Sequence, residues 1–341
     1  MKFLKVPKKS GEKVRKELMA EGILSTDYPI LSEGEYLLFP VTKKYKKLEL
    51  VEREAEKRPK RYDKLKDALS GFLSESELES VIGSFDLIGD IAIIEIPQNL
   101  AEHETRIGEA LLQVHKNIKA VFKKLGPMEG EYRVRRVERI AGEGDTIATY
   151  KESGVMMCFD VAKVYFSVRL AHERKRIADL VNPGERVLVL FAGVGPFALV
   201  IAKKHKDAEI VAIELNPDAV RWMEENIEKN KAGGSVKAVL GDAREVVLRD
   251  YQDFADRVIM PLPHSAEGFL DVAFAGVKDG GIIHFYTFAD IKDPFKEALK
   301  KAETAAKAAD VGISVVGERI ARPYSAQTVQ VVLDLKVRKN Q

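Results

Sequence analysis

The 341-residue sequence predicts an α/β protein whose C-terminal half folds into a doubly wound, mostly parallel sheet. From about residue 160 onward, short apolar runs alternate with helical segments, which is the pattern of parallel strands joined by crossover helices. The last residues form two long β-patterned runs separated by a loop around Pro323, which predicts a C-terminal antiparallel hairpin. Residues 1–155 lack this alternation, and their mixed helical and strand patterns predict two smaller N-terminal α+β domains.

The first small domain is predicted over residues 1–58, because residues 11–24 have helical spacing and residues 34–41 are typical of a strand. The charged, proline-containing stretch 57–66 predicts a linker. A second α+β domain is predicted over residues 67–155. It is expected to contain a hairpin, an amphipathic helix and three further strands, over residues 85–97, 104–124, 131–142, 145–154 and 155–167.

The third and largest domain is predicted over residues 160–341. Its five candidate parallel strands read, in chain order, RVLVLFA, EIVAIEL, VKAVLGD, RVIMPLP and GGIIHFY. The helices that follow them are expected to begin near Pro196, Pro217, Arg244, Ser265 and Pro294. Proline suits the first turn of a helix because the backbone N–H that it lacks has no partner there.

Composition predicts a globular protein with a sizeable core. Apolar residues make up 45% of the chain and charged residues 32%. The longest apolar run, residues 187–202, is interrupted by two glycines and a proline, whereas a membrane span needs about 20 apolar residues, so no membrane partner is expected. No apolar stretch follows the N-terminal lysines, so no signal peptide is expected. Cys158 is the single cysteine, which excludes an intrachain disulfide and fits a cytoplasmic location.

Charge is unevenly distributed, although the net charge is only +2. Residues 1–66 hold 18 Lys and Arg against 11 Asp and Glu, and the remainder holds 37 against 42. A basic N-terminal part of this kind predicts contact with an anionic partner. A lysine-rich surface that meets only solvent is the alternative. The residues concerned include Lys43, Lys44, Lys46, Lys47, Arg58, Lys60 and Arg61.

A glycine-containing turn follows the first predicted parallel strand, where Phe191, Gly193 and Gly195 precede Pro196 in the segment FAGVGPF. Glycines let a ligand approach the backbone, and a strand, a turn and a helix in this order can form a nucleotide site. The same residues match the dinucleotide pattern GxGxxA, so the turn alone leaves a nicotinamide cofactor open.

Residues at the ends of the later strands favour an adenosyl cofactor of another kind over a nicotinamide dinucleotide. Glu214 ends the second strand, 19 residues after Gly195, where a carboxylate can accept both ribose hydroxyls of an adenosyl group. Asp242 ends the third strand, where it could accept from an adenine amino group, or could only cap the next helix. Pro261 lies at the end of the fourth strand, at the rim where a substrate would meet the cofactor. This order of residues resembles the Rossmann-like, S-adenosylmethionine-binding fold of class I methyltransferases.

A more specific resemblance rests on five motifs that occur in one order: EYRVRRVERIAGE (131–143), DVAKVYFSVRLAHERKRIADLV (160–181), FAGVGPF (191–197), AIELNP (212–217) and RVIMPLP (257–263). This series resembles the archaeal-type tRNA (guanine-N1)-methyltransferases, which modify the guanosine 3′ of the anticodon, at position 37 of tRNA. The resemblance implies transfer of a methyl group from S-adenosylmethionine to N1 of that guanosine.

Chemistry at guanine N1 needs a base that removes the N1 proton and a cationic donor near O6. The resemblance implies that Glu173 is the base, that Arg133 stabilises O6 and that Tyr165 is an aromatic of the pocket. It also implies that Arg169 and Pro261 contribute to the cofactor site. Structural roles are the alternatives: an exposed helical ion pair for Glu173, a phosphate-holding strand face for Arg133, and core packing for Tyr165.

A base in a stem-loop must turn outward to enter such a site, and the rest of the RNA would be held by shape and phosphate contacts. The candidate RNA-binding residues are Arg135, Arg136, Lys43, Lys44 and Arg61. The resemblance implies that the N-terminal domain contacts the outer corner of tRNA, and a monomer is expected. His172, His264 and Cys158 are expected to be structural, and no metal-ligand spacing is present.

Pro261 departs from the family pattern, in which many relatives have asparagine at this place. Proline offers neither a side-chain hydrogen bond nor an N–H, so holding the target base would fall to the backbone or to His264. Four alternatives remain open from sequence: methylation of a wyosine-type derivative of the same guanosine, aminocarboxypropyl transfer to it, a non-catalytic tRNA-binding module, and a nicotinamide-dependent oxidoreductase.

Overall fold

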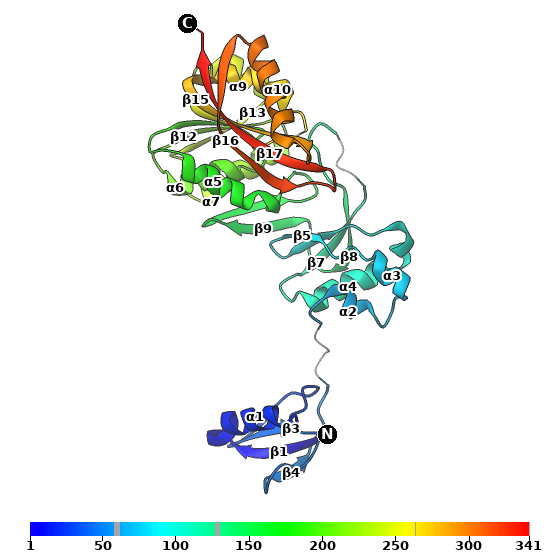
Figure 1. Ribbon diagram of the computed structural model, residues 1–341. Coiled ribbons are helices and arrows are strands. Elements are labelled where there is room, and N and C mark those ends of the chain that lie inside the picture. The colour runs from blue at the N-terminus through cyan, green and yellow to red at the C-terminus, as the bar shows by residue number, and fades with distance from the viewer. Residues whose placement is uncertain (58–61, 127–129, 263, 341) are drawn as a thin grey trace. The chain divides into compact units, whose positions relative to one another are not determined.

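The computed structural model describes residues 1–57, 62–126, 130–262 and 264–340, and Figure 1 shows the chain coloured from its N-terminus to its C-terminus. The chain divides into two compact units, Met1–Ala68 (unit 1) and Leu69–Gln341 (unit 2). Within the described residues, no helix is both long and apolar enough to span a bilayer.

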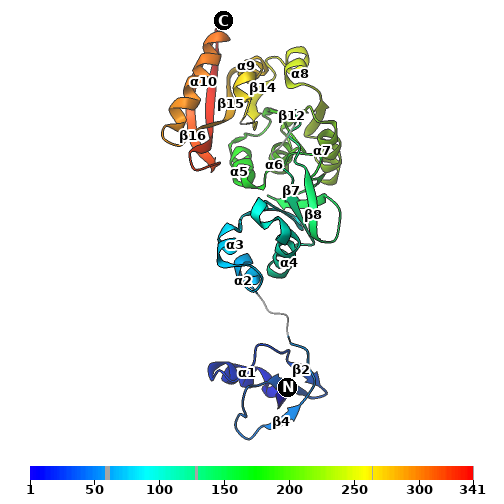
Figure 2. The same ribbon diagram turned by 90° about the vertical axis from the view of Figure 1, so that its right-hand side faces the viewer.

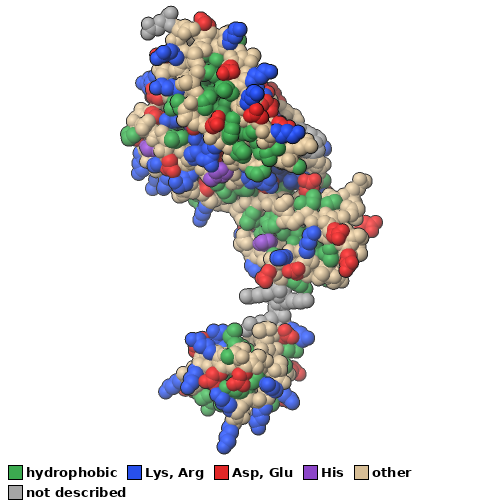
Figure 3. Space-filling view, viewed as in Figure 1, with side chains coloured by type: hydrophobic (Ala, Val, Ile, Leu, Met, Phe, Trp, Pro, Cys, Tyr) green, Lys and Arg blue, Asp and Glu red, His purple; other side chains and the backbone are tan. Residues whose placement is uncertain are grey.

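Unit 1 is built on a small antiparallel sheet with the order β2-β3-β1-β4. The strands are β1 (Lys2–Pro7), β2 (Leu31–Glu33), β3 (Tyr36–Pro40) and β4 (Glu49–Glu52). Helix α1 (Gly11–Ala20) buries Leu18 against Leu4, Val6 and Phe39 of the sheet, so the unit has its own core. Lys43 and Lys44 are exposed in the connection that follows β3. Figure 3 shows basic side chains spread over the visible face of this unit.

The first part of unit 2 holds the four-stranded sheet β5-β6-β7-β8. Its strands are β5 (Phe85–Ile88), β6 (Ile91–Ile94), β7 (Ala120–Lys124) and β8 (Val137–Gly142). Two short helices, α2 (Leu65–Leu69) and α3 (Glu75–Ser80), precede it, and α4 (Glu104–Val114) packs on β7 and β8. The hairpin predicted at Gly89-Asp90 is confirmed as the antiparallel pair β5–β6.

Two predictions for this region are wrong. The helix expected over residues 104–124 ends at Val114, and Ala120–Lys124 is a strand instead. β7 is an interior strand that pairs parallel with β6 and antiparallel with β8, and this pairing outweighs the helical periodicity. The strand expected over residues 131–142 begins only at Val137, because residues 130–133 form a turn.

The seven-stranded sheet of unit 2 has the order β13-β12-β11-β14-β15-β17-β16. The first five strands are parallel, and β17 runs antiparallel to both β15 and β16, as the alternating pattern and the terminal hairpin predict. In chain order the strands are β11 (Arg186–Leu190), β12 (Glu209–Glu214), β13 (Val236–Leu240), β14 (Ala255–Met260), β15 (Val277–Asp290), β16 (Val311–Pro323) and β17 (Thr328–Lys339).

Helices cover both faces of this sheet, and Figure 2 shows the two groups. One core cluster joins the sheet to α5 (Ala171–Leu180), α6 (Pro196–Lys204) and α7 (Pro217–Lys229). The other joins it to α8 (Ala243–Asp250), α9 (Leu270–Gly276) and α10 (Pro294–Ala308). The burial of both faces explains why the parallel strands read as continuous apolar runs in the sequence.

A two-stranded hairpin, β9 (Ile147–Glu152) and β10 (Val155–Asp160), connects the two sheets of unit 2. Two asparagines, Asn226 of α7 and Asn230 directly after it, bond to the backbone of β10 in place of a neighbouring strand. The Asn226 amide bonds to the backbone N–H and C=O of Cys158 at 2.7 and 3.0 Å, and Asn230 does the same at Met156. One hydrophobic cluster runs from the β5–β8 sheet through this hairpin into the large sheet, so the regions share a core.

Candidate active site

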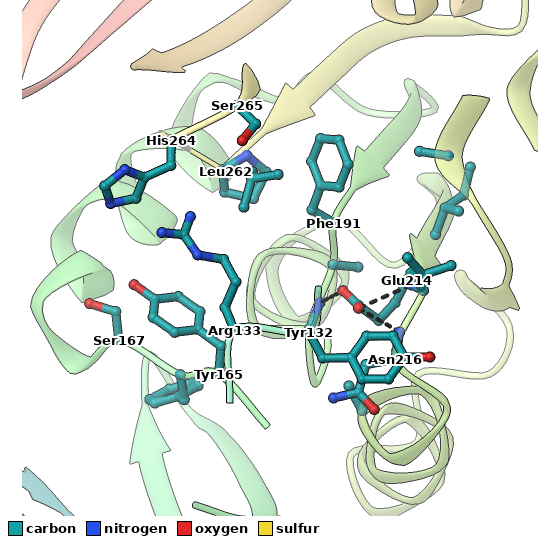
Figure 4. Close-up of a pocket in the computed structure, with 18 of the residues that line it drawn as sticks. Tyr132, Arg133, Tyr165, Ser167, Phe191, Glu214, Asn216, Leu262, His264 and Ser265 are labelled. Carbon is teal, nitrogen blue, oxygen red and sulfur yellow. Dashed lines mark hydrogen bonds between the residues drawn. The ribbon is translucent and has the colours of Figure 1, made fainter. Parts of the chain in front are cut away.

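A cavity of about 520 Å³ opens at the carboxyl ends of β11, β12, β13 and β14. This is the edge at which open α/β sheets bind ligands. Seven of the residues expected at the site line the cavity and come from six stretches of unit 2. They are Arg133, Tyr165, Phe191, Gly193, Glu214, Asp242 and Pro261. Figure 4 shows several of them pointing into the same space.

The glycine turn between β11 and α6 has a backbone that requires glycine. Gly193 has φ +56° and Gly195, the N-cap of α6, has φ +83°. A Cβ on Gly195 would lie 2.9 Å from the buried Met223 Cγ. Phe191 also has a positive φ, and its ring meets Phe269 edge-on with 4.9 Å between ring centroids. The turn therefore exposes backbone and one aromatic face to the cavity.

Glu214 is held rigidly at the end of β12 by backbone donors. Its Oε2 accepts from the Gly193 N–H at 2.7 Å, and its Oε1 accepts from the N–H groups of Leu215 and Asn216 at 3.0 and 2.9 Å. The carboxylate ties β12 to the glycine turn and keeps lone pairs on the cavity side. Ribose hydroxyls are donors that such a fixed carboxylate can bind.

Asp242 caps a helix and also lines the cavity. It is the N-cap of α8, because its Oδ1 accepts from the N–H groups of Arg244 at 2.7 Å and Glu245 at 3.3 Å. It lines the cavity together with its neighbours Gly241 and Ala243. Its predicted contact with an adenine amino group stays a prediction.

Arg133 lies at the other side of the cavity, in the turn that precedes β8. Its φ is +53°, and its N–H donates to the Gly130 carbonyl at 3.2 Å. A left-handed backbone is unusual for arginine and directs the side chain away from the strand direction. Figure 4 shows its guanidinium beside the rings of Tyr165 and His264. The alternative of a phosphate-holding strand face is therefore wrong for Arg133, because the residue lies in a turn before β8.

Arg135 and Arg169 are not among the residues that line this cavity. Both bind Asp86 of β5, at 3.1 and 2.9 Å. This acid joins the segment that carries Arg133 to the 3₁₀ helix at residues 168–170. Arg136 is exposed, Lys43 and Lys44 belong to unit 1, and Arg61 lies outside the described residues.

Glu173 lies in the first turn of α5 and is fully buried. Its Oε2 accepts hydrogen bonds from Arg176 Nε at 2.9 Å and from the Tyr286 hydroxyl at 3.0 Å. Burial and the nearby Glu173 carboxylate raise the pKa of Tyr286 well above its usual value, so the phenol stays a donor. Arg319 Nε lies 3.0 Å from Glu173 Oε1 in an ion pair, but among the described residues this oxygen has no hydrogen-bond partner.

The burial of Glu173 contradicts one interpretation of its sequence context, and its role as a base stays a prediction. It is not an exposed ion pair, because its side chain has no solvent exposure. Neither does it line the cavity, although its neighbours Leu170 and Arg174 do.

A chain of buried charges continues from Glu173 through the large sheet. Arg176 donates to Asp334 at 2.7 Å, and Asp334 lies 2.5 Å from His284 Nδ1. Arg257 donates to His284 Nε2 at 2.7 Å and to Glu185 at 2.8 Å. Burial lowers the pKa of His284, which keeps the ring neutral with its proton on Nδ1, toward Asp334.

Three of the cavity-lining residues that the sequence-based analysis did not single out lie beside His264: Phe288, Arg322 and Tyr324. His264 was expected to be structural, yet it lines the cavity and is exposed. The other three residues lie on β15, on β16 and in the turn after β16, far from any recognised motif. Only His264, three residues after Pro261, carried a signal in the sequence.

The geometry fits an adenosyl cofactor. The glycine turn leaves space beside the backbone, Glu214 presents a fixed acceptor, and Asp242 lies at the next strand end. The last strand of the sheet is antiparallel, unlike the parallel order of dinucleotide-binding domains. Fold and site together define an S-adenosylmethionine-dependent methyltransferase of class I.

Comparison with known families gives the particular group. The TRM5/TYW2 methyltransferase domain matches residues 148–315, the TYW2 N-terminal domain matches residues 65–146, and the tRNA methyltransferase 5 N-terminal domain matches residues 4–49. The chain belongs to the TRM5/TYW2 family of methyltransferases.

Individual relatives match between about three quarters and the whole of this chain. The tRNA (guanine(37)-N(1))-methyltransferase Trm5b of Pyrococcus abyssi is 42% identical over 98% of both chains. A solved complex of aTrm5 with tRNALeu has a TM-score of 0.82 and 34% identity, and covers 99% of both chains. Methanocaldococcus jannaschii Trm5 in complex with adenosine has a TM-score of 0.69 and 33% identity over the full length of both. The M. jannaschii tRNA(Phe) (4-demethylwyosine(37)-C(7)) aminocarboxypropyltransferase is 32% identical over 74% of this chain and 97% of its own.

Proposed function

We propose that this protein transfers a methyl group from S-adenosylmethionine to N1 of guanosine 37 in tRNA. The observation that carries the proposal is one cavity in which a cofactor-type end, at Glu214 and Asp242, faces Arg133 and Tyr165. The extent of the similarity supports it too. The Trm5b relatives of Pyrococcus abyssi and Methanocaldococcus jannaschii each match 98% of this chain, unit 1 included, whereas the aminocarboxypropyltransferase matches 74% of it.

The cofactor end of the cavity would be formed by Phe191, Gly193, Glu214 and Asp242, with Pro261 at its rim. S-adenosylmethionine, when bound, supplies an electrophilic methyl group on a positively charged sulfur. Glu214 orients the ribose through its fixed oxygens, and the apolar walls exclude water from the reacting atoms. Tyr165 lines the cavity and is proposed to contact the target base. Arg169 does not line the cavity, and we propose that it supports the site indirectly, through its hydrogen bond to Asp86.

Arg133 is proposed to stabilise the target base. Removal of the N1 proton places negative charge on O6, and a guanidinium offers two parallel donors to such an oxygen. The left-handed turn at Arg133 and the Asp86 bridge to Arg135 hold the segment in place. Preorganised donors of this kind need no rearrangement during the reaction, which is the source of their catalytic effect.

Glu173 is proposed to be the general base. Its sequence neighbours Leu170 and Arg174 line the cavity, and among the described residues its Oε1 accepts no hydrogen bond, while Oε2 accepts from Arg176 and Tyr286. To take the N1 proton, the carboxylate must gain access to the cavity, which requires the half-exposed Arg319 to move away from Oε1. Arg319 lies on the edge strand β16, where such a movement disturbs no neighbouring strand on its outer side.

Contacts with the rest of the tRNA are proposed for the exposed basic residues Lys43, Lys44 and Arg136, together with Arg61 and Arg135. Unit 1 carries the first two on a surface rich in basic side chains (Figure 3). We propose that unit 1 contacts the outer corner of the tRNA. We also propose that the protein works as a monomer and that it acts in the cytoplasm. Light scattering of the free protein and of its tRNA complex tests the oligomeric state.

Methyl transfer to tRNA transcripts that differ only at position 37 tests the proposed function. The expected result is incorporation of labelled methyl into the transcript with G37 and none into those with A, C or U at that position. Equal incorporation into all four transcripts, or none into any, would contradict the proposal. If no transcript is methylated, calorimetric titration with S-adenosylmethionine, with NAD as the control ligand, shows whether the protein fails to bind the cofactor or fails to bind the RNA.

A further inference from the structure

Three aromatic rings form a cluster at the wall of the cavity. The proposed reaction assigns no role to this cluster. Phe288 of β15 lies between the other two, with ring centroids 4.4 Å from His264 and 4.3 Å from Tyr324. His264 and Tyr324 are themselves 5.8 Å apart. The guanidinium of Arg322 lies 5.7 Å from the Tyr324 ring. All four residues line the cavity.

This cluster is not part of the buried core. Tyr324 is 49% exposed, His264 is exposed, and neither belongs to the hydrophobic clusters of the large sheet. Tyr324 opens the turn between β16 and β17, which is closed by backbone bonds from Tyr324 and Ser325 to the Thr328 carbonyl. The turn does not need a large aromatic side chain, so the exposed ring calls for another explanation.

The cluster lies on the substrate side of the cavity. Figure 4 shows His264 next to Arg133, across the cavity from Glu214 and Asn216. Burial, Arg133 and Arg322 lower the pKa of His264, so its imidazole is neutral at physiological pH. The wall therefore combines flat, uncharged rings with two flanking guanidinium groups. Unpaired RNA bases stack on aromatic and guanidinium planes of this kind, while Arg322, which is not assigned to the target base, can attract a phosphate.

We propose that His264, Phe288 and Tyr324 form a stacking platform for the nucleobase next to the target guanosine in the single-stranded anticodon loop. This inference rests on the proposed function, since it takes guanine at Arg133 as given. When the target base lies at Arg133 and Tyr165, a neighbouring nucleotide of the RNA would lie at the mouth of the cavity, where Tyr324 is exposed. Stacking is tolerant of base identity, so the platform would hold the loop open without reading its sequence.

The test pairs protein variants with tRNA transcripts in which one base is replaced by an abasic ribose. Tyr324→Ala is compared with wild type on intact tRNA and on transcripts abasic immediately 5′ or immediately 3′ of the target. Val316→Ala, a 55% exposed residue of β16 outside the cavity lining, is the matched control. Tyr324→Phe retains the ring. Dissociation constants for tRNA and for S-adenosylmethionine are measured with each protein.

Tyr324→Ala is expected to weaken binding of intact tRNA about five- to a hundred-fold, with Tyr324→Phe and Val316→Ala close to wild type. On the transcript abasic at the contacted neighbour, Tyr324→Ala should cause no further loss, because the stacked base is already absent. Affinity for S-adenosylmethionine should be unchanged throughout. Equal losses on intact and on both abasic transcripts would overturn the platform. Failure of wild-type protein to bind any tRNA would instead contradict the proposed function.

Discussion

Replacing Gly195 with alanine tests the glycine turn most sharply, because the structure separates two costs. The backbone at Gly195 has φ +83°, a conformation that costs an L-residue about 1–2 kcal/mol. The new Cβ would also lie 2.9 Å from Met223 Cγ, and Met223 is fully buried and cannot move into solvent. Overpacking of this kind costs about 1–3 kcal/mol. The total expected destabilisation is about 2–5 kcal/mol.

Gly184 provides the matched control for this substitution. It has φ +71°, is exposed, and has no atom within 4 Å of an added Cβ. Gly184→Ala should therefore show the backbone cost alone, and both variants share the stabilisation that alanine brings by restricting the unfolded chain. Urea unfolding gives the free energy of each variant, provided that the m-value is unchanged. Calorimetry should show weaker S-adenosylmethionine binding only for Gly195→Ala. If Gly195→Ala is no more destabilising than Gly184→Ala, the packing argument is wrong.

Three further predictions concern catalysis, acid stability and RNA recognition. Glu173→Gln should lower the single-turnover methylation rate about 100- to 10,000-fold while the affinity for S-adenosylmethionine stays at the wild-type level, and a wild-type rate would remove Glu173 from the mechanism. Burial raises the pKa of Asp334, but hydrogen bonds from His284 and Arg176 lower it to about 2. Asp334 therefore contributes about 2 kcal/mol to the free energy of unfolding above pH ~4, and this contribution is lost as the pH falls toward 2. In Asp334→Asn, the free energy of unfolding measured with urea should depend less on pH across that window than in the wild type. An unchanged pH dependence would refute this account. Deleting residues 1–66 should lower kcat/KM for full-length tRNA more than for an isolated anticodon stem-loop, without affecting cofactor binding; equal losses on the two RNAs would show that unit 1 does not read the outer corner.

The cofactor end of the site was predictable because it depends on local rules. Each parallel strand is buried on both faces and therefore reads as an apolar run, and the residue after it falls at one edge of the sheet. Gly193, Glu214 and Asp242 are close in space for this reason alone. Pro196 and Pro217 likewise begin α6 and α7, as helix-start rules predict.

The substrate end was less predictable because it depends on contacts between distant segments. Arg133 reaches the cavity from a left-handed turn, which its strand-like sequence YRVRRVERI conceals. Glu173 looks like a surface residue among basic neighbours, and only Tyr286 and Arg176 show that it is buried. The aromatic cluster is assembled from a loop, a strand and a turn, so no spacing in the sequence reveals it.

The most direct test of the central claim follows the fate of a label in S-adenosylmethionine. One sample carries the label in the methyl carbon and the other in the carboxyl carbon of the aminocarboxypropyl group, and both are incubated with unmodified G37 tRNA and the full-length protein. Methyl label recovered as 1-methylguanosine at position 37, with no transfer of carboxyl label, is the predicted result. Transfer of carboxyl label, or methyl label at any other nucleotide, would contradict the account.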